Sequence, residues 1–133
     1  MDIVIDTSAI VAAYKMEEDA RRFWTIFESN AELHLPTTCY LETVMVLRQW
    51  SGSRQWLDRF VSDHQVRMRG VDPPQVRLAA DAFERYGRGS GHPAKLNFGD
   101  CLAYAAAAAL GAPLLFKGGD FALTDVRPAL AAP

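Results

Sequence analysis

The chain has 133 residues, of which 50% are hydrophobic and 23% charged, as is usual for one globular domain with its own core. It contains no apolar run near the roughly 20 residues of a membrane helix, and its N-terminus has neither the basic flank nor the length of a signal peptide. We therefore expect a cytoplasmic protein that does not contact a membrane. The formal net charge of −2 does not by itself favour a polyanionic partner.

The first half of the chain alternates between apolar runs and amphipathic segments. Its first run is rich in β-branched residues, which is typical of a buried parallel strand, and it ends on an acid. In order, the expected elements are a strand at Asp2–Asp6, a helix through Ile10, Val11 and Tyr14, a helix from about Glu17 to Glu28, a strand at Glu32–Leu35, a helix at Thr38–Trp50 and, after a Ser-Gly-Ser break, an amphipathic helix with Trp56, Leu57 and Phe60.

Turn and cap signals divide the second half of the chain. Asp72 followed by Pro73 and Pro74 is a strong helix start, since the acid caps the helix and proline suits its first position. In order, the expected elements are a strand at Val66–Val71, a helix near Gln75–Tyr86, a basic loop at Arg88–Lys95, a helix within Leu96–Gly111, a strand at Pro113–Phe116, a tight loop at Lys117–Phe121 and a short final strand at Asp125–Val126 before an Ala/Pro-rich tail.

This alternation predicts a single α/β domain over residues 1–133, in which a central, mainly parallel sheet has helices on both faces. In such folds, ligands bind beyond the carboxyl ends of the strands. Asp6 and Asp120 each follow a strand, and Asp100 opens a helix that leads into one. The topology therefore places these three acids at the same edge of the sheet.

Asp100 is the lone acid of an Ala-rich, otherwise uncharged helix that begins after Asn97. Taken alone it is a capping acid, because Asn97 is a good N-cap and the free N–H groups and helix dipole favour a carboxylate three residues later. Glu42, inside another apolar helix, is open to either a solvated position or a buried role. Together with Asp6 and Asp120, these residues are four acids at four breaks in hydrophobic pattern, which indicates one shared pocket.

Four carboxylates without cysteine or histidine partners suit Mg²⁺, with Mn²⁺ as a substitute, because these ions prefer oxygen ligands. The reaction that such a site favours is phosphodiester hydrolysis, in which metal ions lower the pKa of a bound water and stabilise charge on the phosphate. We expect Asp6 and Asp100 to be primary metal ligands. Glu42 and Asp120 either complete the catalytic cluster or hold metal-bound waters, with the Thr7 hydroxyl in support. With these acids neutralised, the rest of the chain carries −2 + 4 = +2, which permits a polyanionic substrate.

Other chemistries have weaker support in the sequence. Gly-x-Ser-x-Gly, Walker and Gly-x-Gly-x-x-Gly motifs are absent, and Cys39 and Cys101 lack metal-type spacing, so both thiols are expected to be buried. Asp6 is also a candidate phosphoryl acceptor, but enzymes of that kind usually have a second acid two residues later, where this chain has Ser8. The histidines are scattered and are expected to be structural or exposed: His34, His64 and His92.

The segments around the four acids resemble the PIN-domain ribonucleases and, among them, the VapC toxins of bacterial VapBC toxin-antitoxin pairs. The similar segments are IVIDTSAIVAA around Asp6, CYLETVMVL around Glu42, GHPAKLNFGDCLAYAAA around Asp100 and LLFKGGDFALTDV around Asp120. They occur in the expected order along nearly the whole chain. The Asn-Phe-Gly-Asp motif combined with the later Lys-Gly-x-Asp-Phe motif is much more specific than any single acid.

The resemblance implies properties that the residues alone do not show. It implies a three-layer PIN fold and a Mg²⁺-dependent endoribonuclease that cleaves structured RNA such as tRNA or rRNA. It also implies a homodimer and silencing by a cognate VapB-type antitoxin, which lays an apolar helix in a groove. The candidates for that groove or for the dimer face, which are equally candidates for the core, are Trp24, Phe27, Trp50 and Trp56.

The loop before the fourth acid departs from the pattern. Many PIN domains have a hydroxyl or amide residue there, whereas this chain has Lys-Gly-Gly at positions 117–119. Asp125 is therefore an alternative to Asp120 as the fourth acid, and Lys117 is a candidate phosphate contact.

Two further questions stay open at this point. The basic side chains of Arg88, His92 and Lys95 either meet substrate phosphates at the rim of the acidic site or belong to an ordinary solvated loop. The same motifs also allow a non-catalytic module that binds RNA or protein, and a housekeeping RNA-processing PIN nuclease.

Overall fold

The structure is a computed structural model that describes residues 1–131, so the last two residues of the expected tail lie outside the described residues. Its middle layer is a four-stranded parallel sheet with the strand order β3-β2-β1-β4. The strands are β1 (Asp2–Ile5), β2 (Glu32–Pro36), β3 (Arg67–Arg69) and β4 (Leu114–Leu115). The predicted parallel sheet is confirmed.

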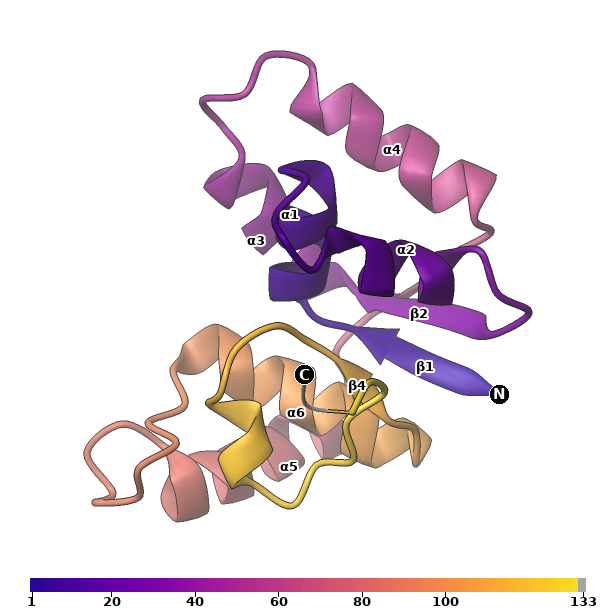
Figure 1. Ribbon diagram of the computed structural model, residues 1–133. Coiled ribbons are helices and arrows are strands. Elements are labelled where there is room, and N and C mark those ends of the chain that lie inside the picture. The colour runs from indigo at the N-terminus through magenta and orange to yellow at the C-terminus, as the bar shows by residue number, and fades with distance from the viewer. Residues whose placement is uncertain (132–133) are drawn as a thin grey trace.

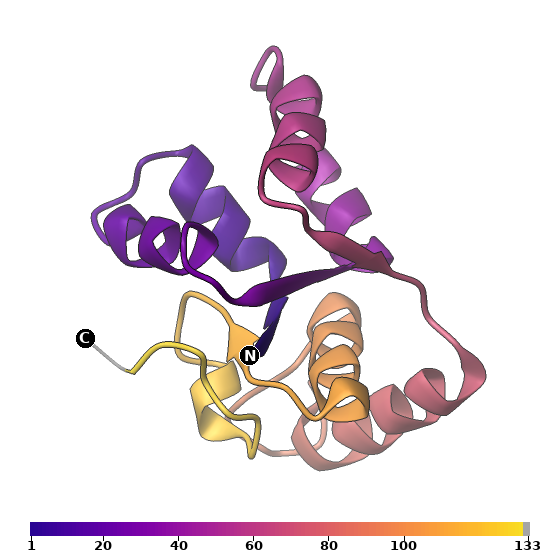
Figure 2. The ribbon, with the colours of Figure 1, turned by 90° about the vertical axis from the view of Figure 1, so that its right-hand side faces the viewer.

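Helices cover both faces of this sheet (Figure 1). One layer contains α1 (Thr7–Tyr14), α2 (Ala20–Phe27), α3 (Thr37–Val46) and α4 (Ser53–Asp63). The other layer contains α5 (Pro73–Tyr86) and α6 (Phe98–Leu110), which pack side by side (Figure 2). The expected α/β/α arrangement is therefore confirmed. None of these helices, within residues 1–131, is long and apolar enough to span a membrane.

The small side chains of α6 let this helix lie against the sheet. Ala103, Ala105 and Ala107 are at most 1% exposed, and α6 contacts β1, β2 and β4. At its end, Gly111 has a φ of 65°, a left-handed conformation that glycine adopts without a Cβ clash, and the chain turns there toward β4. Because α6 runs back along the sheet from the carboxyl ends of the strands, its first residues lie at the edge where β1 ends.

The predicted final strand at Asp125–Val126 is wrong. The chain instead makes one isolated bridge further on, between Leu114 and Pro128, with the Ala129 N–H donating to the Leu114 carbonyl at 2.8 Å. The Leu114 N–H also donates to the Arg127 carbonyl at 2.8 Å, which completes this bridge. The residues before it are held in a turn, in which the Thr124 hydroxyl accepts a bond from the Val126 N–H at 3.2 Å.

Candidate functional site

Asp6 lies directly after β1, and its side chain is buried. It caps α1, because its Oδ2 accepts bonds from the Ser8 N–H at 3.0 Å and from the Ser8 hydroxyl at 2.6 Å. The Ser8 hydroxyl oxygen accepts a bond in turn from the Lys117 N–H at 2.9 Å. These bonds fix the carboxylate at the carboxyl end of β1 and use only one of its two oxygens.

Glu42 comes to Asp6 from α3. Ligand atoms of Asp6, Cys39 and Glu42 all lie within 4.8 Å of one another. Burial and the charge of Asp6 raise the pKa of Cys39 to about 12, so this buried sulfur stays a neutral thiol and forms a wall of the site. The half-buried Glu42 therefore faces the acid cluster, and the solvated position that the sequence left open is not the one observed.

Two threonine hydroxyls hold α1 and α3 together behind the acids. The hydroxyls of Thr7 and Thr43 both donate to the Cys39 carbonyl, at 3.1 and 2.7 Å. Thr43 is fully buried and Thr7 nearly so. Thr7 thus supports the cluster by fixing the backbone of α3, one turn before Glu42, instead of by contacting a carboxylate.

The start of α6 reaches Glu42 through Gly99. A Cβ placed on Gly99 would lie 2.5 Å from the Glu42 Oε2 and 3.2 Å from its Cδ, which is far inside van der Waals contact. Any side chain at this position would therefore push the Glu42 carboxylate away. Sequence reasoning missed the role of Gly99, because the requirement for glycine depends on how α3 packs against α6.

Asp100 has two roles in the structure. It forms the predicted capping box, in which Asp100 N–H donates to Asn97 Oδ1 at 2.9 Å and Asn97 N–H donates to Asp100 Oδ2 at 3.0 Å. Burial raises the pKa of Asp100, and so do the charges of Glu42 and Asp120, against the lowering effects of the Asn97 bond and of Arg88. The cap uses one carboxylate oxygen of Asp100, Oδ2. The charges of Glu42 and Asp120 act on the same carboxylate, so Asp100 also interacts with the acid cluster.

Burial and the neighbouring acids shift the pKa of Asp6. Burial raises its pKa from the usual value of 3.8 to about 6, the bonds from Ser8 lower it, and the charges of Glu42 and Asp100 raise it further. Removal of water and repulsion among carboxylates both disfavour the charged form, and a bound cation relieves both effects. The geometry therefore provides a negatively charged cradle at the edge of the sheet.

Asp120 and Asp125 lie in different surroundings. Asp120 is exposed at the start of the short 3₁₀ helix η1 (Phe121–Leu123), where it makes no capping bond, and its charge acts on Asp100. Asp125 accepts a hydrogen bond from the Tyr104 hydroxyl and lies 3.5 Å from the Arg85 guanidinium. The charge of Asp120 therefore acts on the acid cluster, whereas Asp125 is paired with Tyr104 and Arg85.

Known proteins resemble this chain over nearly its whole length. The family model of the PIN domain matches residues 3–126. The chain is 42% identical over 129 residues to Ribonuclease VapC42 of Mycobacterium tuberculosis, which covers 96% of this chain and 98% of that protein. The chain belongs to the PIN-domain VapC ribonucleases. It is also 42% identical over 131 residues to Ribonuclease VapC28 of the same organism, again with 96% and 98% coverage.

Solved VapC structures share the fold of this VapC ribonuclease. VapC20 of Mycobacterium tuberculosis, a toxin that cleaves the sarcin-ricin loop, superposes with a TM-score of 0.65 at 20% identity, covering 95% of this chain and 99% of that one. VapBC-1 of nontypeable Haemophilus influenzae gives a TM-score of 0.69 at 16% identity, covering 96% of both chains. At these identities the comparison carries the fold alone.

Lys117 is engaged away from the site of this VapC ribonuclease. Its ammonium lies 2.7 Å from Glu17 Oε1 and 3.1 Å from Asp19 Oδ1. These contacts hold the loop before Asp120 against the segment that connects α1 to α2. The ammonium is therefore an anchor of that loop, and the phosphate contact considered from the sequence is not supported.

The basic loop contributes one cation to the neighbourhood of the acids. The charge of Arg88 lowers the pKa of Asp100, which places the guanidinium near the start of α6. The ring of His92 accepts a bond from the Ala94 N–H at 3.1 Å, so this histidine shapes the loop itself. Lys95 is exposed. Of these side chains, Arg88 is the one whose charge acts on Asp100.

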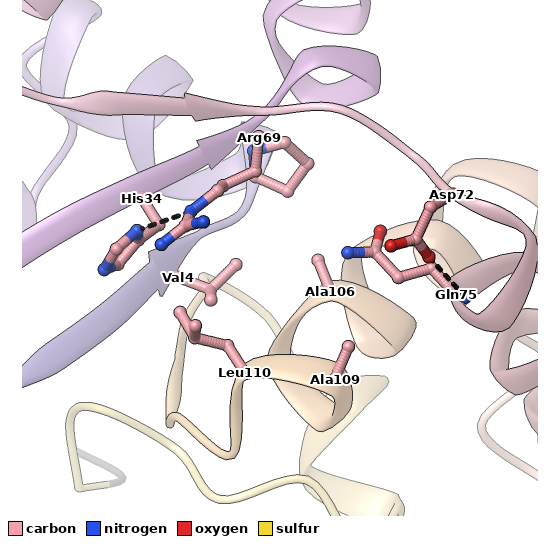
Figure 3. A pocket seen from close by; sticks show the side chains of 9 residues that line it. Val4, His34, Arg69, Asp72, Gln75, Ala106, Ala109 and Leu110 are labelled. Carbon is pink, nitrogen blue, oxygen red and sulfur yellow. Dashed lines mark hydrogen bonds between the residues drawn. The ribbon is translucent and has the colours of Figure 1, made fainter.

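A hollow of about 200 Å³ lies on the α6 side of the sheet, and none of the four acids of the cluster lines it (Figure 3). Within it, Arg69 Nε donates to His34 Nδ1 at 3.1 Å, while His34 Nε2 lies 2.7 Å from Asp2 Oδ1. Because the arginine can only donate, His34 Nδ1 must be the acceptor, and the ring carries its proton on Nε2. This Nε2–H donates a hydrogen bond to Asp2. The ring therefore has no lone pair for a metal, although Asp2, Glu32 and His34 have the spacing of ligands. His34 is structural, as predicted.

Proposed function

We propose that this chain is a Mg²⁺-dependent endoribonuclease and the toxin of a type II toxin-antitoxin pair. It acts as a single domain in the cytoplasm, where its RNA substrates are, and Mn²⁺ substitutes for Mg²⁺. The metal ligands and catalytic residues are Asp6, Glu42, Asp100 and Asp120. The observation that carries the proposal is the buried Asp6 carboxyl beside Glu42, because a bound cation would relieve the burial and the repulsion that raise its pKa to about 6.

The residues fit a hard divalent ion. The cluster offers carboxylate oxygens, and the Cys39 sulfur beside Asp6 and Glu42 remains protonated. The caps of α1 and α6 use only Oδ2 of Asp6 and of Asp100, so capping and metal binding are compatible. When bound, the ion supplies Lewis acidity and a water of lowered pKa for attack on a phosphodiester.

Each side chain has a separate task in this proposal. Asp6 and Asp100 are held rigidly by their caps, so they define where the cation sits. Glu42, pressed against Gly99, provides the third oxygen donor. Asp120 is exposed and reaches the cluster from the side of the substrate. Arg88, near Asp100, binds a phosphate of the RNA and offsets part of the repulsion between RNA and acids.

The test is the chemistry of the cleaved RNA. Attack by water predicts products with a 5′ phosphate and a 3′ hydroxyl, formed with Mg²⁺ or Mn²⁺ and abolished by a chelator. Mapping 5′ ends of cellular RNA after brief induction identifies the substrate, with Asp100→Asn as the inactive control. Ribosomal RNA and tRNA come first, since VapC20, which has the same fold, cleaves the sarcin-ricin loop.

The same experiment separates the alternatives. Protein that binds RNA but yields no metal-dependent ends is a non-catalytic module. Cleavage without growth arrest, from a gene without a small antitoxin-like reading frame immediately upstream, indicates housekeeping RNA processing. Products with a 2′,3′-cyclic phosphate would contradict the proposed role of the acids, because they require attack by the RNA itself.

An exposed apolar patch on and after α3 is the proposed site of the antitoxin. We define the α3 patch as Leu41, Met45, Val46 and Trp50, which are 58%, 62%, 49% and 46% exposed. It begins next to Glu42, so a helix laid across it reaches the acids. Of the aromatic candidates from the sequence, Phe27 is buried and Trp24 and Trp56 are only partly buried against the core. Trp50 is the one that belongs to an exposed face.

We expect Met45→Asp to weaken binding of the cognate antitoxin about 100-fold, because a charge would be buried at the centre of the α3 patch. RNA cleavage by the free toxin should stay unchanged, since Met45 lies one turn beyond Glu42. The measurement is calorimetric titration of toxin with antitoxin, and Met68→Asp on β3 is the control, because Met68 is also an exposed methionine. Equal affinities for both variants would place the antitoxin elsewhere.

A further inference from the structure

The loop that carries Asp120 has few packing contacts of its own. Its residues 117–120 are all exposed, and two of them are glycines, which have no side chain to hold the loop. A hollow of about 330 Å³ is lined by this loop, by Phe23 of α2 and by the C-terminal segment, so the loop does not pack tightly against the core. Its far end is fixed by the buried Phe121. The position of its near end therefore depends on the contacts of Lys117.

The backbone of Lys117 is joined to Asp6 through Ser8. The Lys117 N–H donates to the Ser8 hydroxyl oxygen at 2.9 Å, and this hydroxyl donates to Asp6 Oδ2 at 2.6 Å. The Ser8 N–H donates to the same carboxylate oxygen at 3.0 Å, so Ser8 is itself fixed. Any displacement of the loop at residue 117 therefore breaks a chain of hydrogen bonds that ends on a proposed metal ligand.

The side chain of Lys117 makes a second attachment. Its ammonium lies 2.7 Å from Glu17 Oε1 and 3.1 Å from Asp19 Oδ1, and we call these two ion pairs the Lys117 anchor. The three side chains are between 27% and 37% exposed, so water screens the ion pairs and they add little to the stability of the fold. Two carboxylates on one segment nevertheless restrict where the ammonium, and with it the loop, can lie.

The segment that presents Glu17 has a fixed backbone. α1 ends in a Schellman motif, in which the Glu17 N–H donates to the Ala12 carbonyl at 3.0 Å. The Met16 N–H donates to the Ala13 carbonyl at 3.2 Å, and Met16 has a φ of 55°, a left-handed conformation that glycine adopts more readily. Strain of this kind persists where the surrounding structure enforces it, often beside functional sites. The Glu17 carboxylate is therefore held out toward Lys117 by a rigid turn.

We propose that Lys117 is a positioning residue for Asp120, whose loop is held by the Lys117 anchor and by the bond to Ser8 so that the Asp120 carboxylate faces the other acids. This inference rests on the proposed function, in which Asp120 belongs to the metal site. The charge of Asp120 acts on Asp100, so the loop is held where the two carboxylates interact. Lys117 acts through Asp120 and does not contact the RNA.

Amide hydrogen exchange in the metal-free protein tests the Lys117 anchor without any reaction. Lys117→Met removes the ammonium and keeps a long side chain. Exchange at residue 117, relative to its intrinsic rate, should become about tenfold faster, because the loop opens more often. Lys117→Arg keeps the charge and should restore slow exchange. Lys15→Met is the matched control, since it removes the same charge at the end of α1, where the ammonium lies over the Trp50 ring and outside the anchor.

Metal binding and kinetics supply the second measurement. In Lys117→Met the Asp120 carboxylate is no longer held in place, so the Mg²⁺ affinity should fall about tenfold. The KM for RNA at saturating Mg²⁺ and the melting temperature should stay close to the wild-type values. Removing both carboxylates of the anchor, by Glu17→Gln with Asp19→Asn, should have the same effect. Adding Lys117→Met to that double variant should then change nothing further.

The outcomes separate positioning from direct contact with the substrate. A raised KM for RNA in Lys117→Met with unchanged Mg²⁺ affinity would overturn the proposal and make Lys117 a phosphate contact. The variant without Glu17 and Asp19 carboxylates would then bind RNA more tightly, because its ammonium is released. Unchanged exchange at residue 117 in Lys117→Met would also overturn the proposal, and it would leave the nuclease function standing. A wild-type protein that binds no Mg²⁺ would instead refute the proposed function itself.

Discussion

Asp6→Asn is expected to reduce RNA cleavage about a thousandfold or more and, in the metal-free protein, to raise stability at neutral pH. Activity falls because the amide cannot replace a carboxylate as a ligand of the cation. Stability rises because the charged, buried carboxylate of Asp6 lowers the free energy of unfolding of the metal-free protein. Its pKa in the folded protein, about 6, lies above the ordinary value of 3.8, so the folded state binds the proton more tightly than the unfolded state does.

The sign of this effect fixes its pH dependence. Below pH 3.8 the Asp6 carboxyl group is protonated in both the folded and the unfolded state, so it does not change the free energy of unfolding. As pH rises from 3.8 to 6, this free energy falls. Above pH 6 the full cost applies, and a shift from 3.8 to 6 corresponds to about 3 kcal/mol. Chemical denaturation with a chelator present should therefore show the variant more stable at pH 7.5 and equal to the wild type near pH 4.

The control for this substitution is Asp125→Asn. Tyr104 and Arg85 lower the pKa of Asp125, so its neutralisation should slightly destabilise the protein, the opposite of the effect at Asp6. Cleavage should be retained, because Asp125 lies outside the acid cluster. Mg²⁺ should raise the melting temperature of the wild type and of Asp125→Asn but not of Asp6→Asn. An Asp6→Asn protein that still cleaves RNA at the wild-type rate would remove the basis of the metal assignment.

Local signals in the sequence predicted much of this site. The cap at Asn97 and Asp100 was predictable because capping depends on residues that are neighbours in sequence. The edge shared by Asp6, Asp100 and Asp120 followed from the topology of parallel sheets. The open choice between Asp120 and Asp125 depended on a tertiary contact, the bond from Tyr104, that no local pattern reports.

The position of Glu42 shows where sequence reasoning reaches its limit. Almost every neighbour of Glu42 in α3 is apolar, so periodicity alone did not indicate which face of the helix meets another element. Its place in the cluster is set by the packing of α3 against α6, and therefore by the absence of a side chain at Gly99.

Gly99→Ala tests this packing directly, and we expect it to lower cleavage about 10- to 100-fold in a protein that folds normally. The new Cβ would lie 2.5 Å from the Glu42 Oε2, so the carboxylate must move. Movement costs the fold little, because the displaced atoms are the end of a flexible side chain, and alanine also suits a helix better than glycine does. The loss should therefore appear in Mg²⁺ affinity and turnover while the melting temperature stays unchanged or rises.

Gly70→Ala is the matched control, since a Cβ there has no atom within 4 Å and the same change in backbone freedom occurs far from the acids. It should cleave RNA like the wild type. A Mg²⁺ titration of cleavage rate separates the two effects in Gly99→Ala: weakened binding of the ion is recovered at high Mg²⁺, whereas a misplaced Glu42 that no longer supports the reaction is not. If Gly99→Ala matched Gly70→Ala at every Mg²⁺ concentration, Glu42 would not be a ligand, and the cluster would reduce to Asp6, Asp100 and Asp120.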